Sequence, residues 1–322
     1  MGSMQSDTQL AQQRVRGTKQ SGERKTKGAT QSQDAHASAQ KLESEQRKIR
    51  GKATERRRKL IQFLAMLVYN ADARHWFSGT ISRSPLKRVC VPGLNCYSCP
   101  GAIAACPLGS LQNTIGSGRV PFFVTGFLLL TGTLLGRVVC GFICPAGLVQ
   151  ELLYKIPSRK VRKTKKLLAV TRKVSLLKYV LLAVLVIALP LIFYFKDGLG
   201  SPFFCKLVCP AGTVGAGVPL VMLNEQLRAA IGWLFTWKTA LALIFIVWSI
   251  FMFRPFCRFF CPLGAIYAFF NKIAIFGIRV DATKCTHCNA CVAGCGMDTL
   301  TVNDRECIRC EECRKRCRFG AI

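Results

Sequence analysis

Four apolar stretches stand out along the chain, and each approaches or reaches the length of a membrane helix. The most regular are 174–195 and 120–139, whereas 60–77 is interrupted by polar residues and 239–253 is short but extends backward through Trp233. A helix needs about 20 residues to cross the hydrocarbon core of a bilayer. The pattern therefore predicts a membrane α-helical protein with about four spans.

The same pattern divides the chain into three regions. Residues 1–58 contain few large apolar side chains and cannot offset the entropy cost of folding, so we expect a disordered basic cytoplasmic tail. Residues 59–278 hold the apolar stretches and form the predicted transmembrane domain. Residues 279–322 are rich in cysteine but poor in apolar residues, so this segment needs metal or disulfides to fold.

Charge adds an expected orientation. The chain has 46 Lys and Arg against 16 Asp and Glu, and basic residues concentrate in the tail, in 155–178 and near the C-terminus. The loops 78–118 and 196–238 are less basic. The positive-inside rule then predicts a multi-pass protein of the cytoplasmic membrane with both termini in the cytoplasm. Membrane lipid is the expected partner of the basic segments, and no nucleic acid is expected.

Eight of the 18 cysteines form two copies of C-x2-C-x2-C-x3-C near the C-terminus. In two-cluster ferredoxins with this spacing, the fourth ligand of each [4Fe–4S] cluster comes from the other motif. Residues 279–322 are therefore predicted to be a ferredoxin-like α+β module. Zinc would favour two separate C-x2-C pairs instead. The two expected ligand sets are Cys285, Cys288, Cys291 and Cys317, and Cys307, Cys310, Cys313 and Cys295.

Six further cysteines repeat the motif C-x3-C-P-x-G, and a fourth copy keeps Cys106 but has Ala102 in place of its first cysteine. Cysteines four residues apart share a helix face, so a pair can offer two thiolates to one metal centre. Two pairs supply the four ligands usual for a [4Fe–4S] cluster. Buried packing cysteines are the alternative interpretation. The three complete pairs are Cys140 and Cys144, Cys205 and Cys209, and Cys257 and Cys261.

The predicted topology decides which pairs can meet. Two pairs follow spans that end at the cytoplasmic side, and we expect these to share one cluster: Cys140, Cys144, Cys257 and Cys261. The third pair lies at the opposite side together with four more cysteines. The set preferred there is Cys99, Cys106, Cys205 and Cys209. This leaves Cys90 and Cys96 as a disulfide, an exchange-active dithiol or replacement ligands, unless Cys90, Cys96, Cys99 and Cys106 hold a cluster by themselves.

The three C-x3-C-P copies and the double C-terminal motif resemble the membrane polyferredoxins, over roughly 57–322. That family includes the quinol dehydrogenase subunit serving periplasmic nitrate reductase and a cytochrome-oxidase copper-assembly protein. The stretch Gly93 to Gly101, GLNCYSCPG, is similar to a subgroup of 4Fe–4S binding proteins. The resemblance implies quinol oxidation or a similar redox step at a bacterial inner membrane, with a redox protein or quinone as partner.

Few other groups are candidates for chemistry. The chain has three histidines, of which only His75 lies near an apolar stretch, so a haem held by two histidines is not expected. No nucleotide-binding loop follows a predicted strand. His75, Asp72 and Glu151 are candidate proton acceptors, because ionisable groups near a membrane are often functional.

The expected function is membrane-bound electron transfer between a donor or acceptor, such as quinol, and cytoplasmic [4Fe–4S] clusters. As an enzyme, the chain would be an oxidoreductase component similar to a quinol dehydrogenase. Two alternatives stay open at this point. One is a regulator that senses redox state or metal, and the other is an outer-face thiol or metal reductase acting through Cys90 and Cys96.

Overall fold

The computed structural model describes residues 45–46, 49, 51–161 and 164–322. By its internal contacts the chain divides into two units, Met1–Ala53 and Thr54–Ile322. The described residues of the first unit are helical. The predicted disordered tail lies mostly outside the described residues, and its last residues, 51–58, are helical. All sites discussed below belong to the second unit.

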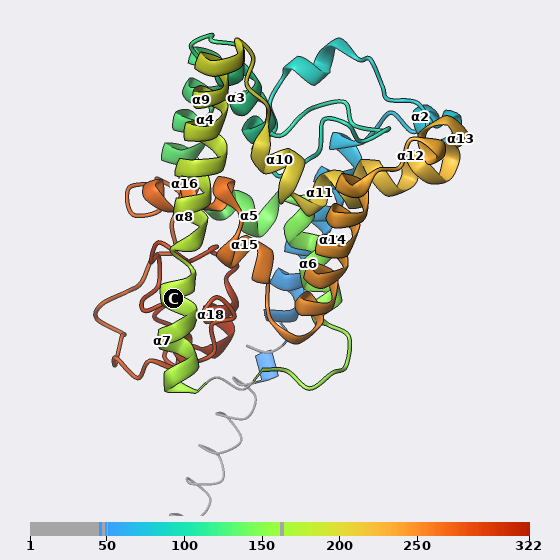
Figure 1. Ribbon diagram of the computed structural model, residues 1–322. Helices are drawn as coiled ribbons and strands as arrows, with labels where there is room; N and C mark the ends of the chain where they lie inside the picture. The colour runs from blue at the N-terminus through green and yellow to red at the C-terminus, as the bar shows by residue number, and fades with distance from the viewer. Residues whose placement is uncertain (1–44, 47–48, 50, 162–163) are drawn as a thin grey trace, which may run out of the picture. The chain divides into compact units, whose positions relative to one another are not determined.

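Helices provide the regular structure of the second unit (Figure 1). The described N-terminal helix ends at residue 69. The next elements are α2 (Arg74–Ser78), η1 (Pro85–Arg88), α3 (Pro107–Gly116), α4 (Phe122–Leu135), α5 (Val138–Phe142), α6 (Pro145–Tyr154), α7 (Lys165–Val174), α8 (Leu177–Leu181), η2 (Leu182–Ala188) and α9 (Leu189–Asp197). The remaining elements are α10 (Phe203–Leu207), α11 (Pro210–Gly212), η3 (Thr213–Gly217), α12 (Val218–Leu223), α13 (Glu225–Ala229), α14 (Trp233–Phe251), α15 (Pro255–Phe259), α16 (Pro262–Phe270), α17 (Ala290–Ala293) and α18 (Glu312–Arg316).

Two of these segments, η2 and η3, are π-helical, and each precedes a proline. Pro190 follows η2 and Pro219 follows η3. Proline has no backbone N–H, so it removes one hydrogen bond from the helical ladder and the preceding turn widens. The helix from α7 to α9 therefore continues through Pro190 instead of ending there.

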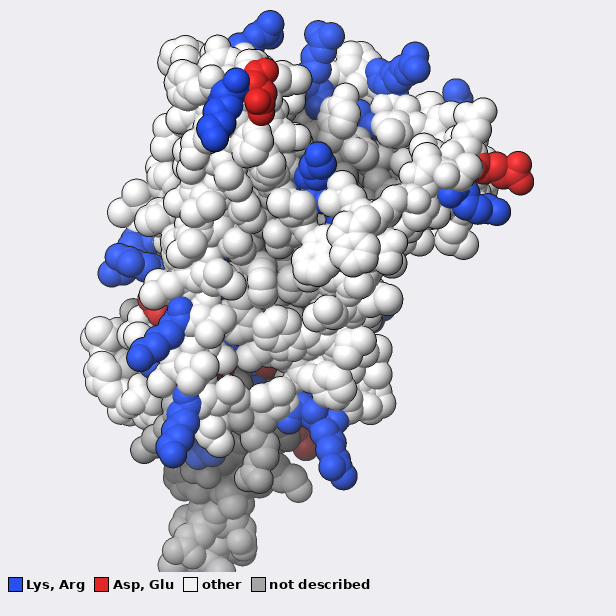
Figure 2. Space-filling view, viewed as in Figure 1, with Lys and Arg blue, Asp and Glu red and all other residues white. Residues whose placement is uncertain are grey.

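Two helices in the described residues are long and apolar enough to cross a membrane. They are Lys166–Asp197, which joins α7, α8, η2 and α9, and Trp233–Phe251, which is α14. On the face shown in Figure 2, Lys and Arg side chains gather mainly toward the two ends, with a largely uncharged area between them over α8 and α14. On this face, the middle portions of the two apolar helices therefore carry few charged side chains.

The prediction of four spans was wrong, because the other two apolar stretches do not form helices of that length. The helix expected over 60–77 ends at residue 69, and the amide of Asp72 donates to the carbonyl of Gly101 instead of continuing the helix. In the stretch 120–139, α4 has 14 residues. It ends at Gly136, whose φ of 54° lies in the left-handed region that glycine tolerates.

The predicted α+β character of residues 279–322 was also wrong. This segment contains the short helices α17 and α18 and no strand, and the described chain has an isolated β-bridge between Cys90 and Ala105. Residues with positive φ interrupt any extended run here, and most of them flank cysteines. They are His287, Asn289, Asp298, Asn303, Arg309 and Glu311.

The buried core of the second unit lies between α3, α4, α5, α15 and α16. Its side chains are mainly apolar and aromatic, as in Val139, Phe204 and Tyr267, which have no exposed surface. Cysteines from the C-x3-C-P motifs belong to the same cluster of buried residues. In Figure 1, the short helices α5 and α15 lie near the centre of this unit. The motif cysteines are therefore placed inside the fold and not on its surface.

Candidate metal centres

Each copy of the C-P-x-G sequence begins a helix, and its cysteine is the residue just before that helix. Cys106, Cys144, Cys209 and Cys261 have extended backbone angles, with ψ between 109° and 133°. The residue before a proline is disfavoured in the helical region, and proline itself suits the first helical position. The cysteine sulfur therefore lies beside unpaired backbone N–H groups. In α16 the amide of Gly264 donates to Cys261 Sγ at 3.4 Å.

The first group of cysteines, here called the central site, combines two motif pairs. Its four side chains come from α5, the residue before α6, α15 and the residue before α16. They line one enclosed hollow that Pro92 and Leu94 also line, and all four cysteines are buried. The sequence predicted that these pairs would meet. The members of the central site are Cys140, Cys144, Cys257 and Cys261.

A second group, here called the distal site, surrounds a much larger hollow of about 550 Å³. Burial, with a smaller contribution from the thiol of Cys96, raises the pKa of Cys205 to about 11. Burial, followed by the thiols of Cys205 and Cys96, raises the pKa of Cys209 to about 12. Burial, followed by the nearby Cys205, also raises the pKa of Cys106. Cys90 lines the same hollow, whereas Cys96 lies beside the turn that follows Cys209, where an added Cβ on Gly212 would lie 3.4 Å from Cys96 Sγ. The distal site is defined by Cys96, Cys106, Cys205 and Cys209.

Cys99, which the sequence placed in the preferred set, lies elsewhere. It lines a neighbouring apolar hollow, together with Cys96, and is not among the residues around the hollow of the distal site. Burial raises the pKa of its thiol, and the amides of Gly101 and Ala102 lower it. Ala102, at the position of the missing motif cysteine, is fully buried. Thus Cys96, from the loop before α3, lines the hollow together with Cys106, Cys205 and Cys209, and Cys99 does not.

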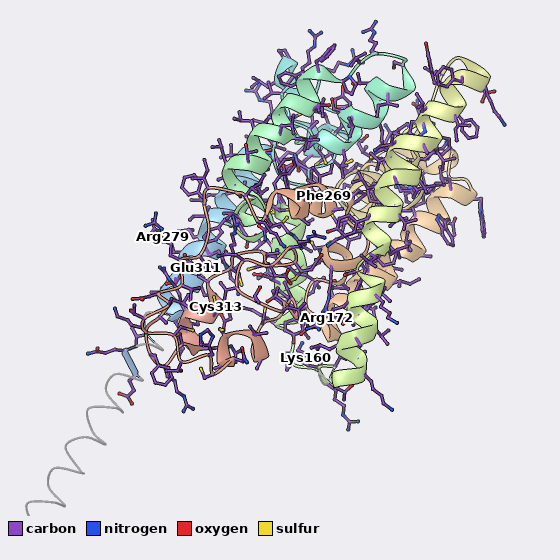
Figure 3. All side chains as sticks on the ribbon, turned by 90° about the vertical axis from the view of Figure 1, so that its left-hand side faces the viewer. Lys160, Arg172, Phe269, Arg279, Glu311 and Cys313 are labelled. Atoms are coloured by element: carbon purple, nitrogen blue, oxygen red, sulfur yellow. The ribbon has the colours of Figure 1, made fainter. Side chains whose placement is uncertain are left out.

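The C-terminal cysteines gather in two sets that follow the predicted exchange of ligands. One set, here the Cys285 site, lines a hollow of about 270 Å³ and comprises Cys285, Cys288, Cys291 and Cys317. In the other, here the Cys307 site, burial, followed by the thiols of Cys310, Cys307 and Cys295, raises the pKa of Cys313 to about 12. Figure 3 labels Cys313 and Glu311 in this C-terminal segment. The last cysteine of each motif therefore lies with the other motif.

Buried ion pairs surround the central site, and the sequence analysis missed them. Glu151 accepts hydrogen bonds from Arg58 at 2.7 Å and from Arg254 at 2.8 Å, and all three residues are buried. Burial alone would raise the pKa of Glu151, but the guanidinium groups of Arg254 and Arg58 hold it below its usual value. A carboxylate held in this way is a poor proton acceptor at neutral pH. The sequence does not predict these ion pairs, because Arg58, Glu151 and Arg254 are far apart along the chain.

Two more ion pairs connect the C-terminal segment to the helices. Glu306 accepts from Arg137 at 2.6 Å and from Lys178, and Asp298 accepts from Arg258. The side chains of Arg137 and Lys178 are fully buried. These contacts hold the Cys307 loop against α5 and α8.

The remaining sequence candidates form a local cluster near α2. His75 Nε2 lies 3.4 Å from a carboxylate oxygen of Asp72, and its Nδ1 lies 2.7 Å from the hydroxyl of Thr80. Both side chains are partly exposed. Neither lines the hollows of the central or distal site, so the structure does not bring them to the cysteines.

The donor sets suit clusters better than single ions. Among the described residues, no three His, Cys, Asp or Glu side chains are close enough to hold one metal ion. A zinc ion bound at about 2.3 Å from each sulfur needs the sulfurs within about 4 Å of one another. Four thiols around one hollow have the Cys₄ donor chemistry that suits a [4Fe–4S] cluster, and these cysteines would be the residues to hold it.

Comparison with known proteins gives the family. A model described as "4Fe-4S binding domain" matches residues 117–164, 179–219 and 233–280, and each segment contains one complete C-x3-C-P pair. The uncharacterized protein MJ0750 of Methanocaldococcus jannaschii is 31% identical over 67% of this chain and 84% of its own length. The chain belongs to the 4Fe-4S binding-domain family. The resemblance to membrane polyferredoxins is thereby confirmed.

Other relatives of this 4Fe-4S protein carry names connected with electron transport or regulation. The putative electron transport protein YccM of Escherichia coli is 24% identical over 83% of this chain and 74% of its own length. The regulatory protein NosR of Pseudomonas aeruginosa is 27% identical over 60% of this chain, which spans a quarter of NosR. No solved structure matches the chain. The family and these relatives support an iron–sulfur electron-transfer protein.

Proposed function

We propose that this protein is a membrane-associated electron carrier that holds four [4Fe–4S] clusters in a line. The proposed ligands are the cysteines of the distal site, the central site, the Cys307 site and the Cys285 site. When bound, such a cluster supplies reversible one-electron transfer. The single observation that carries the proposal is that the four cysteine sets adjoin one another through named contacts.

The first contact joins the distal and central sites. Leu94 lines both hollows, and its amide donates to Cys144 Sγ at 3.4 Å. The loop that supplies Cys96 therefore also covers the central site. A rigid backbone connection of this kind fixes the separation between the two ligand sets.

The second contact joins the central site to the Cys307 site. Gly141, between the two cysteines of its motif, is so close to the 308–310 loop that an added Cβ would lie 2.4 Å from the carbonyl oxygen of Ile308. Asn271, which follows α16, donates to the carbonyl of Cys307 at 2.9 Å. The two C-terminal sites then adjoin because Cys295 and Cys317 each come from the motif of the other site. The exposed Cys288 ends the line.

The line has two ends where a redox partner could exchange electrons. Cys288 and its surroundings suit a protein partner in solution, because a cluster close to the surface is accessible to it. The other end lies beside an apolar hollow of about 460 Å³ lined by α6, α14 and Cys96. A membrane quinol suits that hollow, because its lining is largely apolar and it shares Cys96 with the distal site and Ala146 with the central site.

Iron analysis tests the main proposal. Protein purified with its membrane under anaerobic conditions should contain about sixteen irons per chain, from four cubanes of four irons each. After reduction it should give EPR signals that disappear on oxidation. Protein without redox-active iron would contradict the proposal, and about eight irons would restrict the clusters to the C-terminal sites.

Filling the apolar hollow tests the quinol donor. Ala242→Trp places a large side chain at a buried position that lines it, whereas Leu243→Trp changes the exposed neighbouring position on the same helix. Reduction of the clusters by a reduced quinone analogue should slow at least tenfold in the first variant and remain near the original rate in the second. Equal rates in both variants would place the donor elsewhere.

A further inference from the structure

Two buried glutamines occupy matching positions beside the central and distal sites. Gln150 follows Cys144 by six residues, and Gln112 follows Cys106 by six residues. Each lies on the helix that the C-P-x-G sequence begins, α6 or α3. Gln112 is fully buried and Gln150 nearly so. Two of the four copies of the motif therefore also carry an amide side chain, whereas Gly215 and Tyr267 stand at this position in the other two.

The amide of Gln150 makes a hydrogen bond in every direction available to it. Its nitrogen donates to Cys257 Sγ at 3.0 Å and to the carbonyl of Ala146 at 3.1 Å. Its oxygen accepts from the amide of Phe256 at 3.1 Å. Both of its donors and its acceptor are in use. Gln150, which lies on α6, is thus fixed against α15, and α15 supplies Cys257 of the other cysteine pair.

Gln112 repeats this pattern at the distal site. Its nitrogen donates to Cys205 Sγ at 3.3 Å and to the carbonyl of Leu108 at 3.1 Å. Its oxygen accepts from the amide of Phe204 at 2.9 Å. If either glutamine amide were turned by 180°, its NH₂ group would face the phenylalanine N–H and its oxygen would face the carbonyl of the preceding helical turn. The backbone therefore fixes that the NH₂ group is the end that faces the sulfur.

We propose that Gln150 and Gln112 are positioning residues that tune the reduction potentials of the central and distal clusters, each through one N–H···S hydrogen bond to a ligand sulfur. This inference rests on the proposed function. Reduction adds negative charge that spreads onto the cysteine sulfurs, and a hydrogen bond to sulfur stabilises the more negative form. Burial strengthens the effect, because no water competes for the sulfur.

If each glutamine served only to cap a neighbouring helix, its side-chain oxygen alone would be needed and its side-chain N–H groups would not. The amides of Phe256 and Phe204 belong to the first turns of α15 and α10, where backbone N–H groups lack partners within the helix. Accepting a hydrogen bond from them requires only the glutamine oxygen. The donor toward sulfur is a separate feature, so a variant can remove it while the acceptor remains.

Potentiometric EPR on the full chain tests the proposal. Gln150→Leu should shift the midpoint potential of one cluster to a more negative value, and Gln112→Leu should shift that of a different cluster, while the remaining signals keep their potentials. Gln62→Leu is the matched control, because Gln62 is fully buried on the N-terminal helix and its side-chain oxygen accepts from Arg58. Leucine variants with full iron content and unchanged potentials would overturn the proposal.

Gln150→Glu and Gln112→Glu keep the test decisive if the leucine variants lose iron. Glutamate keeps the acceptor for the phenylalanine amide but replaces the donor with oxygen, so the potential should shift in the same direction. Should both substitutions prevent folding, the original protein labelled with ¹⁵N-glutamine should show hyperfine coupling from one nitrogen to each of two clusters. Absence of that coupling in iron-loaded protein would refute the inference, whereas protein without iron would refute the proposed function instead.

Discussion

At the residue scale, cysteine spacing predicted more of the candidate site than any other feature. Spacing alone indicated the exchange of the last cysteines between the C-terminal motifs, and the structure brings those side chains together. It could not select the fourth member of the distal site, because Cys96 and Cys99 are both in one loop and differ only in the direction that the folded loop gives them. Their roles as ligands stay predictions.

Substitution of these two cysteines separates the alternatives. Cys96→Ser should remove the distal cluster, with a loss of about four irons per chain, because its thiol is the one beside Cys205 and Cys209. Cys99→Ser should leave the iron content and EPR spectrum unchanged, and it is the control. The opposite result would restore the set with Cys99.

At the element scale, the sequence identified which helices are long but not how they are joined. The spans Lys166–Asp197 and Trp233–Phe251 follow from continuous apolar runs. The buried ion pairs could not be predicted, because Arg58, Glu151 and Arg254 are far apart in the sequence and each looks like a solvated charge. Three charges without water nearby stabilise the fold only if all are present.

Removing the carboxylate of this group should therefore be costly. Glu151→Gln leaves Arg58 and Arg254 buried without an opposite charge, and should lower the free energy of unfolding by about 3 kcal/mol. Glu225→Gln, at an exposed position on α13, is the control. Thermal unfolding in detergent measures both, and an equal unfolding temperature would show that water reaches the arginines.

Glu55 connects the N-terminal helix to α18 and gives a pH dependence. Hydrogen bonds from Lys59 and Lys315 lower the pKa of Glu55 from 4.5 to about 2. A lowered pKa means that its contribution to stability is fully present above pH 4.5 and is lost as the pH falls from there toward 2. The difference in unfolding temperature between the original protein and Glu55→Gln should be constant from pH 8 to 5.5 and shrink below 4.5. A difference that changes between pH 8 and 6 would contradict this pKa.

At the scale of the whole molecule, the expected architecture was only partly right. The length of an apolar stretch does not reveal where a helix ends inside it, as α4 does before Gly136. The number of spans was therefore overestimated. The described residues of 279–322 form no strand, because residues with positive φ, most of them next to cysteines, interrupt the extended backbone. The four cysteine sets interleave in the sequence and become neighbours only in the folded chain, and the proposed function depends on the order of those contacts.

The enclosed central site has a consequence for how the protein is made. Its hollow is small, its four cysteines are buried, and the 308–310 loop presses on Gly141 from one side. Because these contacts enclose the central site, we expect iron and sulfide to reach it before the C-terminal segment closes over it. A chelator added to the finished protein should then extract iron from the Cys285 site first and from the central site last, as the sequence of EPR losses will reveal. Simultaneous loss of all signals would mean that the segment opens freely, and maturation would then need no fixed order.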